Sequence, residues 1–233
     1  MSTLNPIFCA LDTTDVPRAT SLANGLKGAV GGLKIGMEFF NAHGPAGYRE
    51  IAKADLPIFL DLKLHDIPNT VAGGIRAVLS LKPAIVNVHA AGGLAMMKAA
   101  AEAAQEAGDA RPLVIAVTML TSLDEGDLRD TGVTGDPADH VLRLAHLAAK
   151  AGLDGIVCSA HEIERLRREL GPDFKLVVPG IRPMGADIGD QKRVMTPPQA
   201  LSLGADVLVI GRPITSAANP HEAATAISAS LAA

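Results

Sequence analysis

The segment 61-DLKLHDIPNT-70 holds an unusual concentration of charge directly after the apolar run 56–60. Side chains alternate between the two faces of a strand, so a strand continuing to residue 63 places Asp61 and Lys63 on the same face. Asp66 follows three residues later. An acid and an amine that project side by side from the end of a buried strand are suited to proton transfer and to stabilising a developing charge.

Two further charged residues, Asp12 and Lys34, end the apolar runs that precede this segment. If the three runs are neighbouring strands, Asp12, Lys34, Asp61 and Lys63 form a cluster of alternating charge. Opposite charges a few ångströms apart lower the pKa of a carboxyl group and favour the ammonium form of an amine. Such a lysine is a poor nucleophile but a well-placed proton donor. The alternative is a salt-bridge network that only joins the strands, but four buried charges without a ligand are costly.

A second group of residues has the composition of a phosphate site. It comprises the segments 179-PGIRPMGADIGDQKR-193 and 210-IGRP-213. Glycines permit close approach of a backbone to a ligand, and an arginine can bind two phosphate oxygens at once. The candidates are Gly180, Gly211, Arg182, Gln191 and Arg212. The long polar stretch 180–195 is typical of a loop that closes over a ligand, although a plain surface loop with an arginine is the simpler alternative.

The remaining candidates are weaker. Thr121 and Ser122 follow an apolar run and could contact a ring or a carboxylate, or could cap a helix. His89 is best explained as a hydrogen-bonded structural histidine. The other histidines show no spacing typical of a metal triad. Cys9 and Cys158 lie within apolar runs and are expected to be free, buried thiols, and no metal site is predicted.

Eight short apolar runs alternate with helical patterns, which predicts a parallel sheet. The expected strands are 7–12, 32–36, 58–63, 85–89, 113–118, 155–159, 175–179 and 206–210. Expected helices include 93–107, 137–151 and 161–170. Eight such units in a chain of this length predict an α/β fold, a (β/α)₈ TIM barrel formed by one domain, 1–233. A doubly wound open sheet is the alternative, but 11-LDTT-14 lacks the glycine-rich turn expected after its first strand.

A barrel also explains where the polar residues lie, because active sites of this fold gather at the C-terminal ends of the strands. The composition sets further limits. Aromatic residues are only 3% of the 233 residues, so the core must be aliphatic. A net charge of −4 without a basic patch argues against nucleic-acid binding. No apolar run approaches the ~20 residues of a membrane span and no signal-peptide pattern opens the chain, so a cytoplasmic protein is expected.

The segments FCALD, LKIGMEFF, DLKLHDIPNT, VNVHAAGG, VVPGIRP, GDQKR and IGRPI together resemble the orotidine 5′-phosphate decarboxylase family of the bacterial type. The resemblance covers residues 7–214. The D-x-K-x-x-D core alone is shared with sugar-phosphate decarboxylases and synthases of the same superfamily, and the longer segments are more specific. The resemblance implies a homodimeric barrel that converts orotidine 5′-monophosphate to uridine 5′-monophosphate and CO₂ in pyrimidine biosynthesis. It also implies that no metal or organic cofactor takes part.

The resemblance further implies roles for individual residues. Lys63 is similar to the proton donor for a C6 carbanion that is stabilised electrostatically, and Asp61 is similar to the carboxylate beside that of the substrate. Asp12 and Lys34 match positions that hold the ribose hydroxyls and complete the charge network. Asp66 and Thr70 match a pair delivered across the dimer interface. Thr121 matches a position near the pyrimidine, and the phosphate-gripping positions are matched by Arg182, Gln191, Gly211 and Arg212.

Two rival functions remain at this point. The first is a magnesium-dependent relative, such as a keto-gulonate phosphate decarboxylase or a hexulose phosphate synthase. Lys34 opposes a metal there, and Glu38 is the only close acid after it. The second is a non-catalytic barrel that binds nucleotide phosphates, which would keep Arg212 and Gln191 but would not need Asp61 and Lys63.

Overall fold

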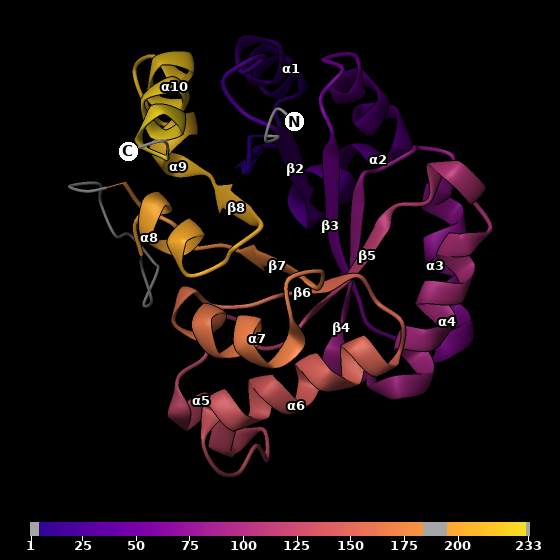
Figure 1. Cartoon of the computed structure of the whole chain (residues 1–233). Helices are drawn as coiled ribbons and strands as arrows, with labels where there is room; N and C mark the ends of the chain where they lie inside the picture. Colours follow the sequence, from indigo (N-terminus) through magenta and orange to yellow (C-terminus); the bar gives the residue numbers. More distant parts are fainter. Residues whose placement is uncertain (1–4, 184–194, 232–233) are drawn as a thin grey trace.

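The eight apolar runs form eight parallel strands that close into a barrel in sequence order (Figure 1). The computed structural model describes residues 5–183 and 195–231. The strands are β1 (Ile7–Ala10), β2 (Gly32–Gly36), β3 (Ile58–Leu64), β4 (Ile85–His89), β5 (Leu113–Val117), β6 (Gly155–Val157), β7 (Lys175–Val178) and β8 (Val207–Ile210). The pairing of β1 with β8 confirms the predicted barrel and excludes the open sheet.

Helices pack around the outside of the strands, as Figure 1 shows. Their N-termini carry local start signals: Asp15, Asp136 and Asn219 accept backbone N–H groups as N-caps, and each is followed by a proline in the first turn. The helices are α1 (Val16–Gly25), α2 (Met37–Ala52), α3 (Pro68–Leu79), α4 (Gly93–Gln105), α5 (Glu125–Asp130), α6 (Pro137–Lys150), α7 (Ile163–Leu170), α8 (Pro197–Ser202), α9 (Arg212–Thr215) and α10 (Pro220–Ser230). Short 3₁₀ turns cover Ala90–Gly92, Gly108–Ala110 and Ala160–Glu162.

The core has two layers, as the alternation of side chains along each strand requires. The barrel interior is filled by a small cluster: Phe8, Ala10, Phe59, Ile85, Ile115, Val177 and Val209. The alternate residues face outward and pack against the helices in a larger cluster that is mostly aliphatic. Cys9 and Cys158 belong to this outer layer, and both are free and buried, as predicted.

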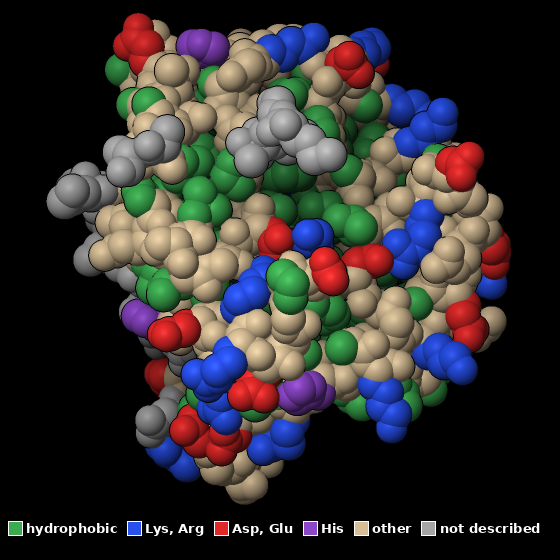
Figure 2. All heavy atoms as spheres, viewed as in Figure 1, with side chains coloured by type: hydrophobic (Ala, Val, Ile, Leu, Met, Phe, Trp, Pro, Cys, Tyr) green, Lys and Arg blue, Asp and Glu red, His purple; other side chains and the backbone are tan. Residues whose placement is uncertain are grey.

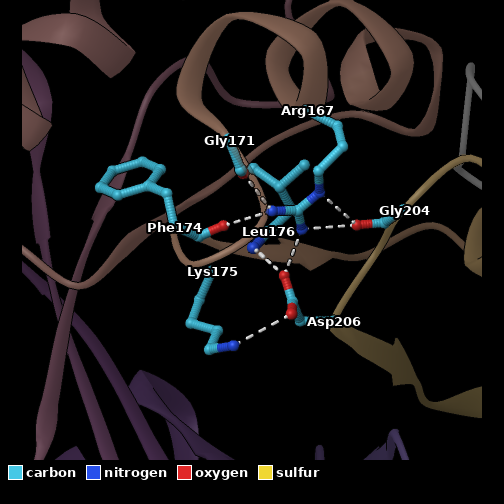
Figure 3. Close-up of polar contacts among 7 residues, drawn as sticks. All are labelled: Arg167, Gly171, Phe174, Lys175, Leu176, Gly204 and Asp206. Atoms are coloured by element: carbon cyan, nitrogen blue, oxygen red, sulfur yellow. Dashed lines mark hydrogen bonds and ion pairs between the residues drawn. The ribbon is translucent and has the colours of Figure 1, made fainter.

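The N-terminal end of the barrel is held together by partly buried polar contacts. Arg167 donates hydrogen bonds to the carbonyl oxygens of Gly171, Phe174 and Gly204 and forms an ion pair with Asp206 (Figure 3). Asp206 also accepts the backbone N–H of Leu176 at 2.8 Å. Asp154 accepts the N–H of Val114 in the same way and pairs with Arg111. These acids precede β8 and β6, so they fasten neighbouring strands at the end opposite the predicted active site.

In the part of the chain that the structure describes, no helix is both long and apolar enough to cross a membrane.

Candidate active site

A cavity of about 440 Å³ lies at the C-terminal ends of the strands. Its lining contains nine of the predicted site residues: Asp12, Lys34, Asp61, Lys63, Thr121, Gly180, Arg182, Gly211 and Arg212. Its apolar lining includes Phe59, Val117, Met119 and Val209, so the charged groups face a partly apolar space. Figure 2 shows acidic and basic side chains next to one another near the centre of one face, beside a hollow with hydrophobic walls.

Three neighbouring strands bring the predicted charge cluster together. Lys34 pairs in register with Ala10 and Phe59, whose side chains lie inside the barrel, so its amine points into the cavity. The Lys34 Nζ atom lies 3.2 Å from Asp12 Oδ1 and 3.4 Å from Asp61 Oδ2. Asp61 Oδ1 lies 2.7 Å from Lys63 Nζ. The order Asp12, Lys34, Asp61, Lys63 therefore alternates in charge, as the sequence predicted.

Burial and charge act in opposite directions on this cluster. Burial alone would raise the pKa of Asp61, but Lys34 and Lys63 outweigh it and hold that pKa below its ordinary value. Burial likewise disfavours the charged form of Lys34, but Asp61 and Asp12 outweigh it and raise the Lys34 pKa. Asp61 and Lys34 are therefore both ionised at neutral pH, although their side chains are only 10% and 11% exposed.

Lys63 departs from the regular strand that the alternating pattern predicted. Its φ is 52°, in the left-handed region that side chains other than glycine seldom adopt. The pairing of β3 with β4 also shifts, because Leu60 and Leu64 lie opposite Val86 and Val88, which are only two residues apart. A bulge of this kind redirects side chains and is frequent next to active sites. It leaves the Lys63 amine within hydrogen-bond distance of Asp61.

Asn87 of β4 contacts this bulge and was missed by the sequence analysis. Its Nδ2 atom donates to Asp61 Oδ1 at 2.7 Å, and its Oδ1 atom accepts the backbone N–H of Lys63 at 2.8 Å. The signal was present in the run 85-IVNVH-89, where an amide occupies a position with the same orientation as Ile85, inside the barrel.

The phosphate side of the predicted site is formed by the ends of β7 and β8. Gly180 has a φ of 76°, a conformation for which glycine is favoured. Arg182 is buried, and its Nη1 atom donates to the carbonyl oxygen of Ile181. Arg212 is the first residue of α9 and follows Gly211, the residue after β8. The predicted Gln191 lies outside the described residues.

Of the two candidate residues after β5, Thr121 and Ser122, only one lines the cavity. Thr121 lines the cavity together with Met119 and Leu120, whereas Ser122 is exposed and is not among the lining residues. The capping role considered for this pair belongs to Asp124, whose side chain accepts the N–H groups of Gly126 and Asp127.

Asp66 and Thr70 do not line the cavity of their own chain. Both are exposed at the start of α3, and Asp66 Oδ1 accepts the N–H of Ile67. Ile67 itself is 67% exposed, the largest exposed fraction among the three exposed large hydrophobic side chains of the described residues, Met37, Ile67 and Leu120.

His89 packs against His65, with ring centroids 5.4 Å apart. Burial lowers the pKa of His89, and the neighbouring His65 and Lys63 lower it further. In residues 5–183 and 195–231, no group of three or more His, Cys, Asp or Glu side chains is arranged to hold a metal ion.

The geometry agrees with the results of comparison with known proteins. The family model for "Orotidine 5'-phosphate decarboxylase / HUMPS family" matches residues 5–227. The chain is 57% identical to the orotidine 5′-phosphate decarboxylase of Rhodospirillum rubrum, over 98% of this chain and 95% of that protein. It is 56% identical to the orotidine 5′-phosphate decarboxylase of Erythrobacter litoralis, over 97% of this chain and 99% of that protein.

A solved structure agrees with these sequence relatives. The crystal structure of orotidine 5′-phosphate decarboxylase from Lactobacillus acidophilus superimposes with a TM-score of 0.87 at 36% identity, covering 98% of this chain and all of that chain. The matches extend over nearly the whole barrel and include every strand that lines the cavity. The chain belongs to the orotidine 5′-phosphate decarboxylase / HUMPS family.

Proposed function

We propose that the protein decarboxylates orotidine 5′-monophosphate to uridine 5′-monophosphate and CO₂, a step of de novo pyrimidine biosynthesis, without a metal or organic cofactor. The observation that carries the proposal is the contact of Lys63 Nζ with Asp61 Oδ1 at 2.7 Å inside a partly apolar cavity. The names of the curated relatives support the substrate.

The chemistry needs a positive charge at one carbon atom. When the bond between C6 and the carboxylate breaks, CO₂ leaves and the electron pair stays on C6 in an orbital that the ring cannot delocalise. Without a cofactor to accept the pair, stabilisation must come from charge that is already in position. The Lys63 ammonium supplies that charge and then transfers its proton to C6, and it regains a proton from water.

Asp61 contributes in two ways. It holds Lys63 in place, and it lies beside the substrate carboxylate, so its repulsion is relieved as CO₂ departs. Two like charges ~4 Å apart repel by about 4 kcal/mol at an effective dielectric near 20. A typical enzymatic rate acceleration requires about 8–23 kcal/mol, so this repulsion accounts for only part of the effect.

The phosphate group supplies a further part. Arg182 and Arg212 line the cavity and follow β7 and β8, and an arginine can hold two phosphate oxygens at once. Binding energy obtained there can be used to exclude water and to fix the pyrimidine ring against the charge cluster. Gln191 belongs to the same proposed phosphate site, and Asp12 and Lys34 would bind the ribose.

We also propose that the active form is a homodimer in which Asp66 and Thr70 serve the partner's cavity. Both are exposed and absent from the cavity of their own chain. The exposed Ile67 between them provides apolar area that an interface would cover.

A magnesium-dependent reaction is disfavoured by the charge pairing in the cavity. Among the described residues, the acids that line the cavity are Asp12 and Asp61, and both contact the Lys34 ammonium. A divalent cation placed there would have to displace that lysine or lie beside its positive charge.

The proposal is tested by adding purified protein to orotidine 5′-monophosphate in EDTA and following the substrate's absorbance. We expect loss of the orotate band and formation of uridine 5′-monophosphate at an unchanged rate when EDTA is present. No turnover of this substrate, together with magnesium-dependent turnover of a sugar phosphate, would overturn it in favour of the rival within the superfamily.

A further inference from the structure

We propose that Asn87 is a positioning residue for the reaction, and that its carboxamide fixes Asp61 and Lys63 relative to each other. This inference rests on the proposed function, because it assumes that these two residues act on the substrate. Asn87 lies in β4 and is only 1% exposed, so its side chain is shielded from solvent and its partners are groups of the barrel interior.

The bulge in β3 creates the need for such a residue. Between Leu60 and Leu64, β3 contains two more residues than the facing part of β4, so the backbone of Lys63 has no partner in the regular ladder. Its N–H group instead donates to Asn87 Oδ1 at 2.8 Å. A side-chain carbonyl therefore takes the place of a backbone carbonyl, and it does so at the residue whose φ is 52°.

The other half of the carboxamide binds the acid. Asn87 Nδ2 donates to Asp61 Oδ1 at 2.7 Å, and this is the same oxygen that Lys63 Nζ contacts at 2.7 Å. Among side chains of this size, only a carboxamide has both a donor and an acceptor on one planar group while it stays neutral at pH 7. Leucine would satisfy neither contact, and an ionised aspartate would keep the acceptor but repel Asp61.

Two hydrogen bonds from one rigid group therefore determine where the proton donor and its carboxylate stand. The bond to Asp61 also helps to lower the pKa of that carboxyl group, after the larger effects of Lys34 and Lys63. Positioning of this kind affects the chemical step rather than substrate affinity, because the phosphate and ribose contacts lie elsewhere.

The test compares Asn87→Ala and Asn87→Asp with Val88→Ala, a control on the outward face of the same strand whose side chain is fully buried. We expect kcat of Asn87→Ala to fall on the order of 10- to 100-fold, as for loss of a hydrogen bond to a charged group. KM and the affinity for uridine 5′-monophosphate should stay within about threefold. Val88→Ala should unfold at lower urea concentration but keep its kcat.

The pH dependence of Asn87→Asp separates positioning from packing, because aspartate has nearly the shape of asparagine. At pH 8 the introduced carboxylate repels Asp61, and kcat should be low. As the pH falls, the introduced carboxyl group takes up the proton, since Lys34 and Lys63 keep the charge on Asp61, and it can then donate to Asp61. The ratio of its kcat to that of the wild type should therefore rise from pH 8 to pH 5.

The outcomes distinguish this inference from the proposed function. If Lys63→Ala is inactive but both Asn87 variants keep the wild-type kcat, the role of Asn87 is refuted while the site assignment stands. A constant kcat ratio of Asn87→Asp between pH 8 and pH 5 would also refute it. If Lys63→Ala itself remains fully active, the site assignment fails, and the role of Asn87 fails with it.

Discussion

Removal of Lys34 is expected to destabilise the fold in a pH-dependent way. In Lys34→Met, the chain keeps a side chain of similar length but loses the charge between Asp12 and Asp61. At 3.4 Å and an effective dielectric near 20, the attraction between Lys34 and Asp61 is about 5 kcal/mol. Several kcal/mol of this lost attraction are offset in the variant, because folding no longer has to remove an ammonium group from water. Asp61 also retains Lys63 at 2.7 Å.

The net loss in the free energy of unfolding should therefore be about 2–3 kcal/mol at pH 7.5, below the range of about 3–5 kcal/mol for breaking a buried ion pair, because Asp61 keeps Lys63. Asp12 adds little, because its side chain is 60% exposed and water replaces the lost contact. The loss should be measured by urea denaturation at a fixed protein concentration, since the stability of the proposed dimer would depend on concentration. Lys53→Met is the matched control, because the pair of Lys53 with Glu50 is exposed, and its effect should be within about 0.5 kcal/mol.

The sign of the pH effect follows from the direction of the Asp61 shift. In the wild type the folded pKa of Asp61 lies below its ordinary value of 3.8, so its stabilisation is complete above that value and is lost as pH falls through the folded pKa. Without Lys34, the pKa of Asp61 rises because burial is then opposed only by Lys63 and the hydrogen bond from Asn87, so the carboxyl group takes up a proton at a higher pH. The deficit of the variant should therefore be smaller at pH 5 than at pH 7.5. Equal deficits at both values would show that Lys34 does not hold Asp61 in its charged form.

Three further predictions concern separate parts of the molecule. Arg167→Met should cost about 2–3 kcal/mol of stability, because three carbonyl groups lose a charged donor while Asp206 keeps its contacts with Lys175 and with the Leu176 N–H. The kcat of the folded fraction should be unchanged, and a large loss of kcat would contradict the separation of the two barrel ends. Arg212→Ala should lower kcat/KM for orotidine 5′-monophosphate ~100-fold and for orotidine less than about threefold, whereas equal losses would remove Arg212 from the phosphate site. Co-expressed Lys63→Ala and Asp66→Asn chains should recover about a quarter of the wild-type activity, because half of randomly assembled dimers are mixed and each has one intact site of two; no recovery would place both residues in the same chain's site.

The fold was predictable because the apolar runs, the helical patterns between them and the chain length all indicated the same (β/α)₈ barrel. All eight apolar runs became strands, and the expected helices 137–151 and 161–170 correspond to α6 and α7 with shifts of one or two residues at their ends. Several expected strands, such as 155–159, end one or two residues early because the last positions turn towards the cavity or cap the next helix. Ser159 illustrates this, since its side chain accepts the N–H of His161.

The charge cluster was also predictable, because a charged residue that ends a buried strand needs a partner. The bulge was not, since the pattern L-D-L-K-L alternates as a regular strand does, and nothing in it indicates the positive φ of Lys63. Asn87 was missed for a related reason: one amide within an apolar run resembles a tolerated core position until the facing strand is known. The roles of Asp66 and Thr70 depend on a second chain and remain predictions.

The central claim is that Lys63, held by Asp61, protonates C6 of a bound nucleotide. It is tested most directly by a single-turnover experiment with Lys63→Ala and wild-type protein in EDTA, each in excess over orotidine 5′-monophosphate. We predict complete conversion to uridine 5′-monophosphate by the wild type, and no conversion by a folded Lys63→Ala variant that still binds uridine 5′-monophosphate. Conversion by Lys63→Ala at a rate near that of the wild type would contradict the account.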